Sequence, residues 1–182
     1  MRIISGSHKG KRLQAPRNLP ARPTTDFAKE GLFNILRNRI DLSEIRVLDL
    51  FAGIGGISFE FASRGAEMVV AVDKHPGCVR FIQQTATKLD LPIRTVKMDC
   101  WTYLRKDSNS YDLIFMDPPY EMQALELGKY HGQIMEGSRL KTDGLLIIEH
   151  SKHQDISDLS NFVEMRKYGG SVFSIFQKEA GL

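Results

Sequence analysis

Residues 46–56, RVLDLFAGIGG, decide the fold of this 182-residue chain. The first five form a short, mostly apolar run typical of a buried strand, and Gly53, Gly55 and Gly56 follow closely. Glycines in that place let the backbone turn sharply, approach a ligand and enter a helix N-terminus. The stretch predicts a strand, a glycine-rich turn that binds a ligand, and a helix. A tight turn without a ligand is the alternative.

Apolar runs alternate with helical segments from residue 45 onward. We expect strands at 46–50, 68–72, 93–98, 112–116 and 144–149, and helices near 56–64, 76–89, 100–106 and 122–137. Because the runs are continuously apolar, the strands are expected in a mostly parallel, doubly wound sheet covered on both faces. Two last strands, 162–168 and 171–177, are joined by Gly169-Gly170, which is typical of an antiparallel hairpin.

The N-terminal segment has a different pattern. Residues 2–5 and 10–13 predict a small hairpin, and Pro16, Pro20 and Pro23 then favour an extended linker. A helix is expected from Asp26 to Arg37, capped by Thr25 or Asp26. We therefore divide the chain into an extension, 1–40, and a main domain, 41–182.

Charge is concentrated in this extension. Residues 1–40 contain nine Lys/Arg and two Asp/Glu, a net charge of +7, so residues 41–182 carry −4 of the overall +3. Such asymmetry is typical of a surface that binds a polyanion such as nucleic acid. A solvated basic arm that binds nothing is the alternative.

Several classes of protein are excluded by the composition. The longest aliphatic run, 145–148, is far shorter than the roughly 20 residues of a membrane span, and no secretory segment is visible. Cys78 and Cys100 make neither a disulfide framework nor a zinc motif, so we expect a cytoplasmic protein without a metal. A monomer is the default expectation.

Acidic residues end two of the predicted strands. Asp73 follows Gly53 by 20 residues and could accept hydrogen bonds from a ribose diol, although a surface acid is an equal alternative. Asp99 could accept from an adenine amine or simply cap the next helix, and Cys100 is interpreted as a small wall residue. Position 58 is Ser58 where a dinucleotide fingerprint needs glycine, which argues against hydride chemistry.

The most specific motif follows the fourth strand and reads Asp117-Pro118-Pro119-Tyr120. The prolines remove backbone donors and stiffen the chain, so the segment presents only acceptors, the Asp117 carboxylate and the Pro118 carbonyl. Its natural guest is an NH₂ group, and Tyr120 offers a ring on which a planar base can stack. A Pro-Pro loop with a half-buried tyrosine is the structural alternative.

Together these residues resemble the Rossmann-like class I methyltransferases that use S-adenosylmethionine. The segments that carry the likeness are 49–55, Asp73, Asp99 and 117–120. The N-terminal segments 1–4, 9–13, 22–26 and 29–34, with Glu149 and Tyr168-Gly169, are similar to the bacterial RsmD family. That family methylates a guanine N2 amine of 16S ribosomal RNA. The sequence leaves open naked RNA or a ribosomal particle as the substrate, and the resemblance implies a partly or fully assembled small subunit.

The resemblance implies roles for particular residues. The cofactor would be bound by Asp49, Phe51, Ala52, Gly53, Gly55, Asp73, Lys74, Asp99 and Cys100. The reaction would involve Asp117, Pro118, Pro119 and Tyr120, and RNA would contact Lys9, Lys11, Arg12, Arg22, Thr24 and Thr25. Two departures are visible: Phe27 stands where a base is expected, and Asp73 where glutamate is frequent.

Two other classes of function remain open at this point. A DNA adenine or tRNA amine methyltransferase would use the same acceptors, because its target is also an NH₂ on a planar base. A non-catalytic RNA-binding or assembly protein on this fold is the third hypothesis. It is disfavoured because mere RNA binding requires none of the cofactor residues.

Overall fold

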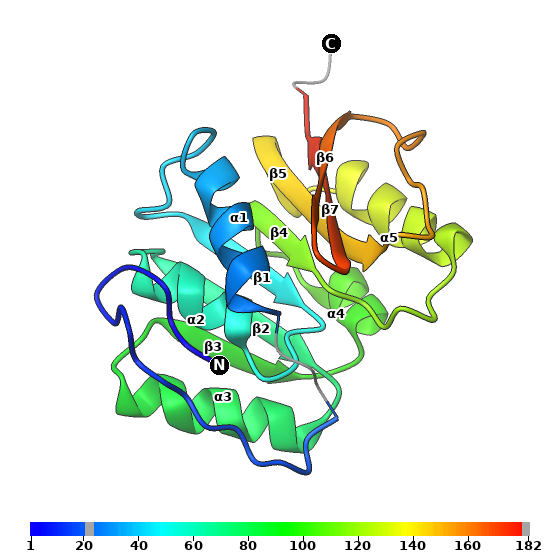
Figure 1. The fold of residues 1–182 in the computed structure, drawn as a ribbon. Coiled ribbons are helices and arrows are strands. Elements are labelled where there is room, and N and C mark those ends of the chain that lie inside the picture. The colour runs from blue at the N-terminus through cyan, green and yellow to red at the C-terminus, as the bar shows by residue number, and fades with distance from the viewer. Residues whose placement is uncertain (21–23, 180–182) are drawn as a thin grey trace.

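The computed structural model describes residues 1–20 and 24–179. Its strands form one sheet in the order β3-β2-β1-β4-β5-β7-β6 (Figure 1). They are β1 (Arg46–Leu50), β2 (Met68–Asp73), β3 (Ile93–Lys97), β4 (Tyr111–Met116), β5 (Leu140–Ser151), β6 (Phe162–Tyr168) and β7 (Ser171–Gln177). β1 to β5 pair in parallel, whereas β7 is antiparallel to β5 and β6. The predicted fold, a mostly parallel doubly wound sheet ending in an antiparallel hairpin, is confirmed.

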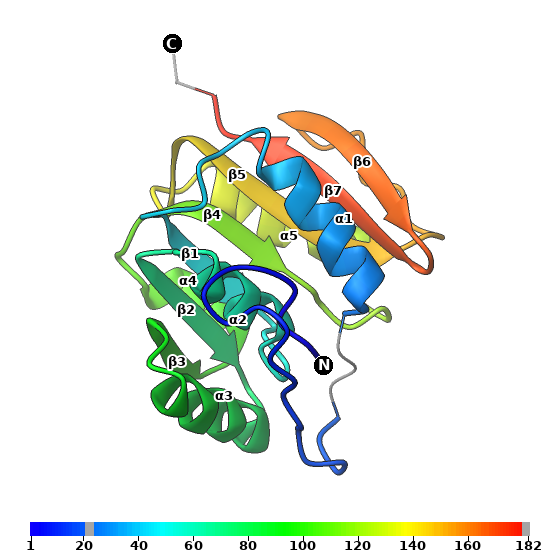
Figure 2. The ribbon, with the colours of Figure 1, turned by 60° about the vertical axis from the view of Figure 1, so that its left-hand side comes forward.

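Five helices cover the two faces of the sheet within the described residues, and Figure 2 shows them from a second side. They are α1 (Asp26–Leu36), α2 (Gly56–Ser63), α3 (Pro76–Lys88), α4 (Cys100–Lys106) and α5 (Ala124–Met135). One core joins α1, α2 and α3 to the sheet face that carries Phe115 and Ile147. The other joins α4 and α5 to the face that carries Met116 and Ile148. Burial on both faces explains why the strands are apolar throughout.

The boundaries differ from the prediction mainly around β5 and α5. β5 begins at Leu140 rather than residue 144, because Leu140 pairs with Tyr111 before a register shift. α5 begins at Ala124 rather than residue 122, because a turn comes first, in which the Met122 amide donates to the Pro119 carbonyl at 2.9 Å. Both deviations arise from tertiary pairing and turn geometry that hydrophobic periodicity does not report.

The predicted N-terminal hairpin forms, and it is fixed to the main domain. Ile3 and Lys11 pair through the backbone at 3.0 Å beside a single antiparallel bridge. The buried carboxylate of Glu60 in α2 accepts from the amides of Ile4 and Ser5, at 2.8 and 3.0 Å. Gly6 has a φ of +85°, and a Cβ there would lie 1.8 Å from a carbonyl oxygen of α2. Glycine at this position therefore lets the hairpin lie directly against the helix.

The extension also shares its core with the sheet. Ile3, Leu13 and the inner face of α1 belong to the same buried cluster as Phe59 and Phe115. Residues from both sides of the expected division into 1–40 and 41–182 thus contribute to one buried cluster, and the division itself stays a prediction. No helix within the described ranges is long and apolar enough to cross a membrane.

Candidate active site

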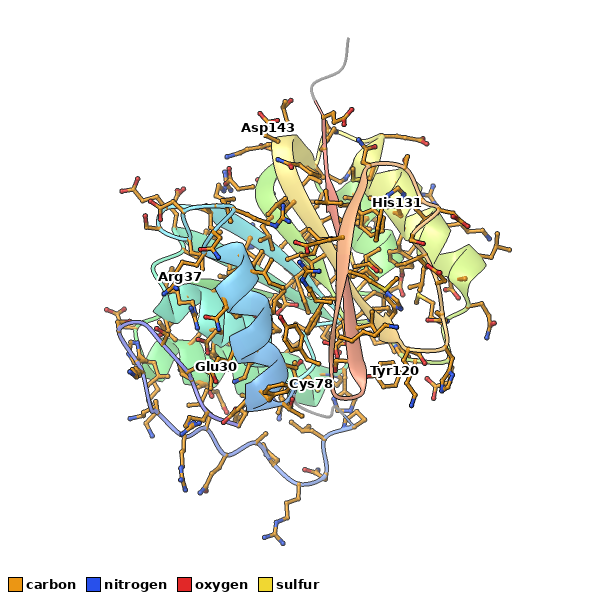
Figure 3. The ribbon with its side chains drawn as sticks, turned by 45° about the horizontal axis from the view of Figure 1, so that its top comes forward. Glu30, Arg37, Cys78, Tyr120, His131 and Asp143 are labelled. Atoms are coloured by element: carbon orange, nitrogen blue, oxygen red, sulfur yellow. The ribbon has the colours of Figure 1, made fainter. Side chains whose placement is uncertain are left out.

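The predicted cofactor and catalytic residues lie at the ends of β1, β2, β3 and β4. The Ala52 amide donates to the Val72 carbonyl at 3.0 Å, and the Asp117 amide donates to the Leu50 carbonyl at 3.3 Å. These bonds continue the strand pairing into the loops, so the loops leave the sheet side by side. This carboxyl edge is the usual ligand edge of an open α/β sheet. Figure 3 places Tyr120 and Cys78 toward this edge and Asp143 at the opposite one.

The glycine-rich loop has an unusual backbone. Phe51, Gly53 and Gly55 have φ values of 60°, 55° and 79°, in the left-handed region. A Cβ at Gly55 would lie 2.8 Å from the Ile82 side chain, so α3 packs directly against this loop. Only glycine combines this φ with this contact at low cost. The loop is therefore held close to the sheet edge and turns at once into α2.

Asp73 holds that loop from the next strand. Its carboxylate accepts from the Gly53 amide at 2.8 Å and from the His75 amide at 2.7 Å. A carboxylate has about four lone-pair positions, so two remain for a ligand such as a ribose diol. The neighbouring Lys74 is exposed. The structure thus gives Asp73 an organising role that the strand-end argument did not predict.

Asp99 and Cys100 lie at the start of α4. The Asp99 carboxylate accepts from the Thr102 amide at 2.9 Å, which is the helix cap considered as the simpler alternative. Cys100 is buried, and its sulfur accepts from the Phe51 amide at 3.2 Å. Burial raises the pKa of this thiol to about 12, so it stays protonated at neutral pH. Cys100 therefore stabilises the loop and does not act as a nucleophile.

An aromatic wall that the sequence did not predict stands beside this loop. The Tyr130 ring on α5 lies 5.5 Å from the Phe51 ring and 5.2 Å from the Trp101 ring, centroid to centroid. Only Phe51 was among the predicted cofactor residues. Trp101 follows Asp99 and Cys100 at once in the chain, which is the local signal that could have included it.

Three acids lie on the β1, β4 and β5 side of the site, two of them buried and Asp117 half-buried. Asp49 and Glu149 are 1% and 2% exposed, and Asp117 lies between their strands. The ion pairs recorded among the described residues do not involve any of the three. The Ser58 hydroxyl donates to the Asp49 carboxylate. The serine at position 58, where a dinucleotide fingerprint needs glycine, therefore donates a hydrogen bond to a buried acid.

Burial and mutual repulsion keep these acids from ionising easily. Burial raises the pKa of Asp49 to about 7, and the Ser58 hydrogen bond partly opposes this rise. The pKa of Asp117 is raised well above its ordinary value, first by burial and then by the nearby Glu149 and Asp49 carboxylates. Burial also raises the pKa of Glu149. A cationic ligand would favour the ionised forms, because an opposite charge lowers a carboxyl pKa.

The segment after β4 supplies the open side of the site. Pro118 is buried, whereas Pro119 and Tyr120 are exposed, Tyr120 to 53%. Ser171, at the start of β7, lies close enough to Tyr120 to affect the pKa of its hydroxyl. The half-buried Asp117 acceptor therefore lies close in the chain to an exposed ring that can stack on a base.

The predicted RNA residues are only partly brought together. Lys9, Lys11 and Arg12 are exposed on the hairpin, but the Thr25 hydroxyl is used to cap α1, accepting from the Ala28 amide at 3.2 Å. Thr24 begins the second described range, and Arg22 lies outside the described residues. Lys29, counted in the basic charge, is 1% exposed and donates to the Arg2 carbonyl. The basic surface is thus smaller than the charge count indicates.

Phe27, which stands where a basic residue is expected, packs against another aromatic ring. Its ring is 65% exposed and lies 5.7 Å from the Tyr168 ring, in an edge arrangement. A Cβ at Gly31 would lie 2.2 Å from the Tyr168 ring, so glycine makes room for this tyrosine beside α1. An aromatic pair, rather than a charge, therefore occupies the start of α1.

The strand order, the glycine loop after β1 and the Asp-Pro-Pro-Tyr segment after β4 define a class I, Rossmann-like methyltransferase. The family described as Conserved hypothetical protein 95 matches residues 1–177, and the chain belongs to it. The RsmD family predicted from the residues is thereby confirmed.

Two curated relatives show the breadth of the match. "Putative rRNA methyltransferase YlbH" of Bacillus subtilis is 34% identical over 186 residues, which cover 98% of this chain and 99% of the relative. "Ribosomal RNA small subunit methyltransferase D" of Escherichia coli is 27% identical, and the match covers 99% of this chain and 91% of that protein.

Solved structures show the same fold. "Putative methyltransferase yhhF from Escherichia coli" has a TM-score of 0.87 at 22% identity and covers 100% of this chain and 99% of that chain. A Thermus thermophilus 16S rRNA N2 methyltransferase, RsmC, in complex with AdoMet and guanosine, has a TM-score of 0.70 at 20% identity. That match covers 88% of this chain and 45% of RsmC.

Proposed function

We propose that this protein transfers a methyl group from S-adenosylmethionine to the exocyclic N2 amine of a guanine in small-subunit ribosomal RNA. The observation that carries the proposal is the half-buried acceptor Asp117 directly after β4, beside the exposed ring of Tyr120. Membership of a family with curated small-subunit rRNA methyltransferases supports the RNA substrate. The cytoplasm, where ribosomes assemble, would be the place of action.

The site's residues fit this cofactor. S-adenosylmethionine supplies an electrophilic methyl group on a positively charged sulfur. The buried Asp49 and Glu149 carboxylates and the half-buried Asp117 carboxylate take part in none of the ion pairs of the described residues, so they suit a cation. Asp73 keeps acceptor capacity for a ribose diol beside the glycine loop.

The chain's own contribution to the reaction would be orientation. Asp117 and the Pro118 carbonyl would hold both amine hydrogens, and Tyr120 would stack on the base and fix its plane. The amine lone pair, delocalised into the guanine ring, would then point out of that plane toward the methyl donor. Positioning of this kind can lower a barrier by roughly 7–11 kcal/mol. No strong general base is needed, because the methylated ammonium sheds a proton readily.

A methyl-transfer assay tests the proposal against its alternatives. The protein, with tritiated S-adenosylmethionine, would be offered 16S RNA, assembled small subunits, tRNA and DNA. We expect label in 16S RNA or small subunits, and nuclease digestion with mass spectrometry should find N2-methylguanosine. Label on adenine in DNA or on tRNA would replace the proposed substrate. Calorimetry that finds no cofactor binding would favour a non-catalytic RNA-binding protein.

The exposed bases of the N-terminal hairpin would engage RNA phosphates. Each phosphate contact adds about −0.7 (single strand) to −0.9 (duplex) to the slope of log K against log salt. With roughly four contacts, the slope should lie near −3, and replacing Lys9, Lys11 and Arg12 together should flatten it by about 2. Cofactor affinity should not change, because these side chains are exposed on the hairpin.

A salt series of RNA affinities, with cofactor titrations alongside, measures this effect. The matched control replaces three exposed bases of the main domain, Arg94, Lys97 and Lys106, and should leave the slope near its original value. Equal slopes for the hairpin variant and the unmodified protein would mean that RNA is bound elsewhere.

A further inference from the structure

Glu149 stands beside Asp117 in the sheet. The parallel register of β4 and β5 pairs Phe115 with Ile147 and Met116 with Ile148, so the next positions along are Asp117 and Glu149. Adjacent parallel strands lie about 4.8 Å apart, and neighbours in register point to the same face. The two carboxyl groups therefore enter the site together, from neighbouring strands.

One oxygen of Glu149 has no hydrogen-bond partner among the described residues. The residue is 2% exposed, and the unpaired atom is Oε2. Leaving a buried carboxylate oxygen without a donor is costly, so such groups are rare in folded proteins unless a ligand completes them. Arg46 and Arg139 also have buried side-chain nitrogens without a partner among the described residues. Both lie at the opposite edge of the sheet, so neither can donate a hydrogen bond to Glu149.

The surroundings of Glu149 face the position of the target base. The hydroxyls of Tyr120 and Ser171 are close enough to lower its pKa, against the rise caused by burial. Tyr120 is the ring proposed to stack on the base. A base lying on Tyr120 with its amine at Asp117 would thus have the adjoining atom of its Watson–Crick edge at Glu149.

We infer that Glu149 selects guanine by accepting a hydrogen bond from the ring N1–H while Asp117 holds the neighbouring N2 amine. Guanine presents these two donors side by side, and ionised carboxylates are pure acceptors, so two adjacent carboxylates match this edge. Adenine carries a lone pair at N1 beside its amine, which would face the Glu149 lone pairs. The inference rests on the proposed function and names the residue that excludes adenine.

Substituted substrates test this selection without altering the protein. RNA carrying 2-aminopurine at the target position keeps the 2-amino group but replaces the N1 donor with an acceptor. At pH 8.5, which favours the ionised carboxylate, we expect its kcat/KM to fall by about 10² or more relative to guanine. Sites built around a substrate donor discriminate strongly against analogues that lack it. Equal rates on the two substrates would overturn the inference.

Glu149→Gln makes the test specific to this side chain. An amide can either donate or accept, so the variant should lose activity on guanine and gain relative activity on 2-aminopurine. The ratio of the two kcat/KM values should move toward one by at least about tenfold. A merely structural role would lower both rates and leave the ratio unchanged, which would also overturn the inference.

The matched control is Asp143→Asn, which makes the same change of charge in the same strand. Asp143 is exposed at the end of β5 that lies away from Tyr120 (Figure 3). Its substrate ratio should equal that of the unmodified protein. If the unmodified protein methylates no guanine N2 at all, the proposed function fails first, so the two failures are distinguishable.

Discussion

The acids of the site fall into two groups with opposite surroundings. Asp73 and Asp99, on the β2 and β3 side, accept hydrogen bonds from backbone amides of the loops around them. Asp49, Asp117 and Glu149, on the β1, β4 and β5 side, are buried or half-buried close to one another and have raised pKa values. The first group holds loops in place, whereas the second takes part in none of the ion pairs of the described residues, and so lacks the cationic partner that favours burial of a carboxylate.

This difference indicates a division of labour across the sheet. Carboxylates that the backbone already satisfies can bind an uncharged ribose or amine without changing protonation. Carboxylates that lie close together and away from water are stabilised most by a cation and by a base with several hydrogen-bond donors. Such a ligand offsets both the loss of hydration and the mutual repulsion of the carboxylates. Substitutions should therefore have their largest effects at Asp49, Asp117 and Glu149, which take part in none of the ion pairs of the described residues.

The largest effect should be a fall in stability with rising pH in the cofactor-free protein. Asp49 has a pKa of about 7 when folded, against 3.8 ordinarily, so the folded state binds more protons between these values. The unfolding free energy should therefore decrease from about pH 4 to pH 7, by up to about 4 kcal/mol. Asp49→Asn should flatten the curve, as measured by denaturant unfolding across the pH range.

Ser58→Ala provides the matched test of this pH dependence. Removing the hydroxyl that stabilises the ionised Asp49 should move the decline to higher pH. An unfolding free energy that rises between pH 4 and 7, in the unmodified protein and in both variants alike, would contradict the grouping of Asp49 with Asp117 and Glu149.

Turnover should respond most strongly at Asp117. Asp117→Ala removes a preorganised acceptor for the target amine, so kcat should fall by on the order of 10²–10³ while the fold and cofactor binding persist. Asp117→Asn keeps one acceptor oxygen and should lose less. Single-turnover methyl transfer measures both variants, and turnover of the alanine variant within twofold of the original would sink the assignment.

Cofactor affinity should fall when Asp73 is replaced, one of the two acids that accept hydrogen bonds from backbone amides. Losing a charged acceptor costs about 1.5–3 kcal/mol, so Asp73→Ala should weaken cofactor binding by roughly 10–150-fold. The ribose is held equally in the ground and transition states, so KM should change more than kcat. Calorimetry gives the dissociation constant, and Asp155→Ala, an exposed acid in a loop after β5, is the control. An unchanged constant would remove Asp73 from the site.

Much of this fold was predictable because its strands are buried on both faces and its turns carry glycine or proline. Gly65 after α2, Pro76 at the start of α3 and Gly169-Gly170 between β6 and β7 all lie where turn chemistry places them. The pairing of β5 with Tyr111 was missed, since a register shift depends on the partner strand.

The candidate site was predictable only in part, for a related reason. Residues that end strands, such as Asp73 and Asp117, were found because parallel strands share one edge. The hydrogen-bond partners of these groups were not visible in the sequence. The bond from Ser58 to Asp49 and the bonds from the hairpin to Glu60 depend on how helix α2 packs, and the unpaired oxygen of Glu149 depends on which side chains surround it in the fold.

The smallest effect is expected at Asp99, where a cap and a ligand contact compete for one exposed carboxylate. Asp99→Ala removes the cap on Thr102 and should lower the unfolding free energy by about 1 kcal/mol. If the same carboxylate also accepts from the adenine amine, cofactor affinity should fall by roughly 2–12-fold, the range of an ordinary hydrogen bond.

Asp99→Asn separates the two roles, because asparagine caps helices about as well as aspartate. This variant should keep its stability and most of its cofactor affinity, since the amide oxygen remains an acceptor. Thermal unfolding and calorimetry on both variants measure the two quantities. If Asp99→Ala lowers the stability but leaves the cofactor affinity unchanged, Asp99 is a helix cap alone. Of the two acids that accept hydrogen bonds from backbone amides, Asp73 would then be the one that also binds the cofactor.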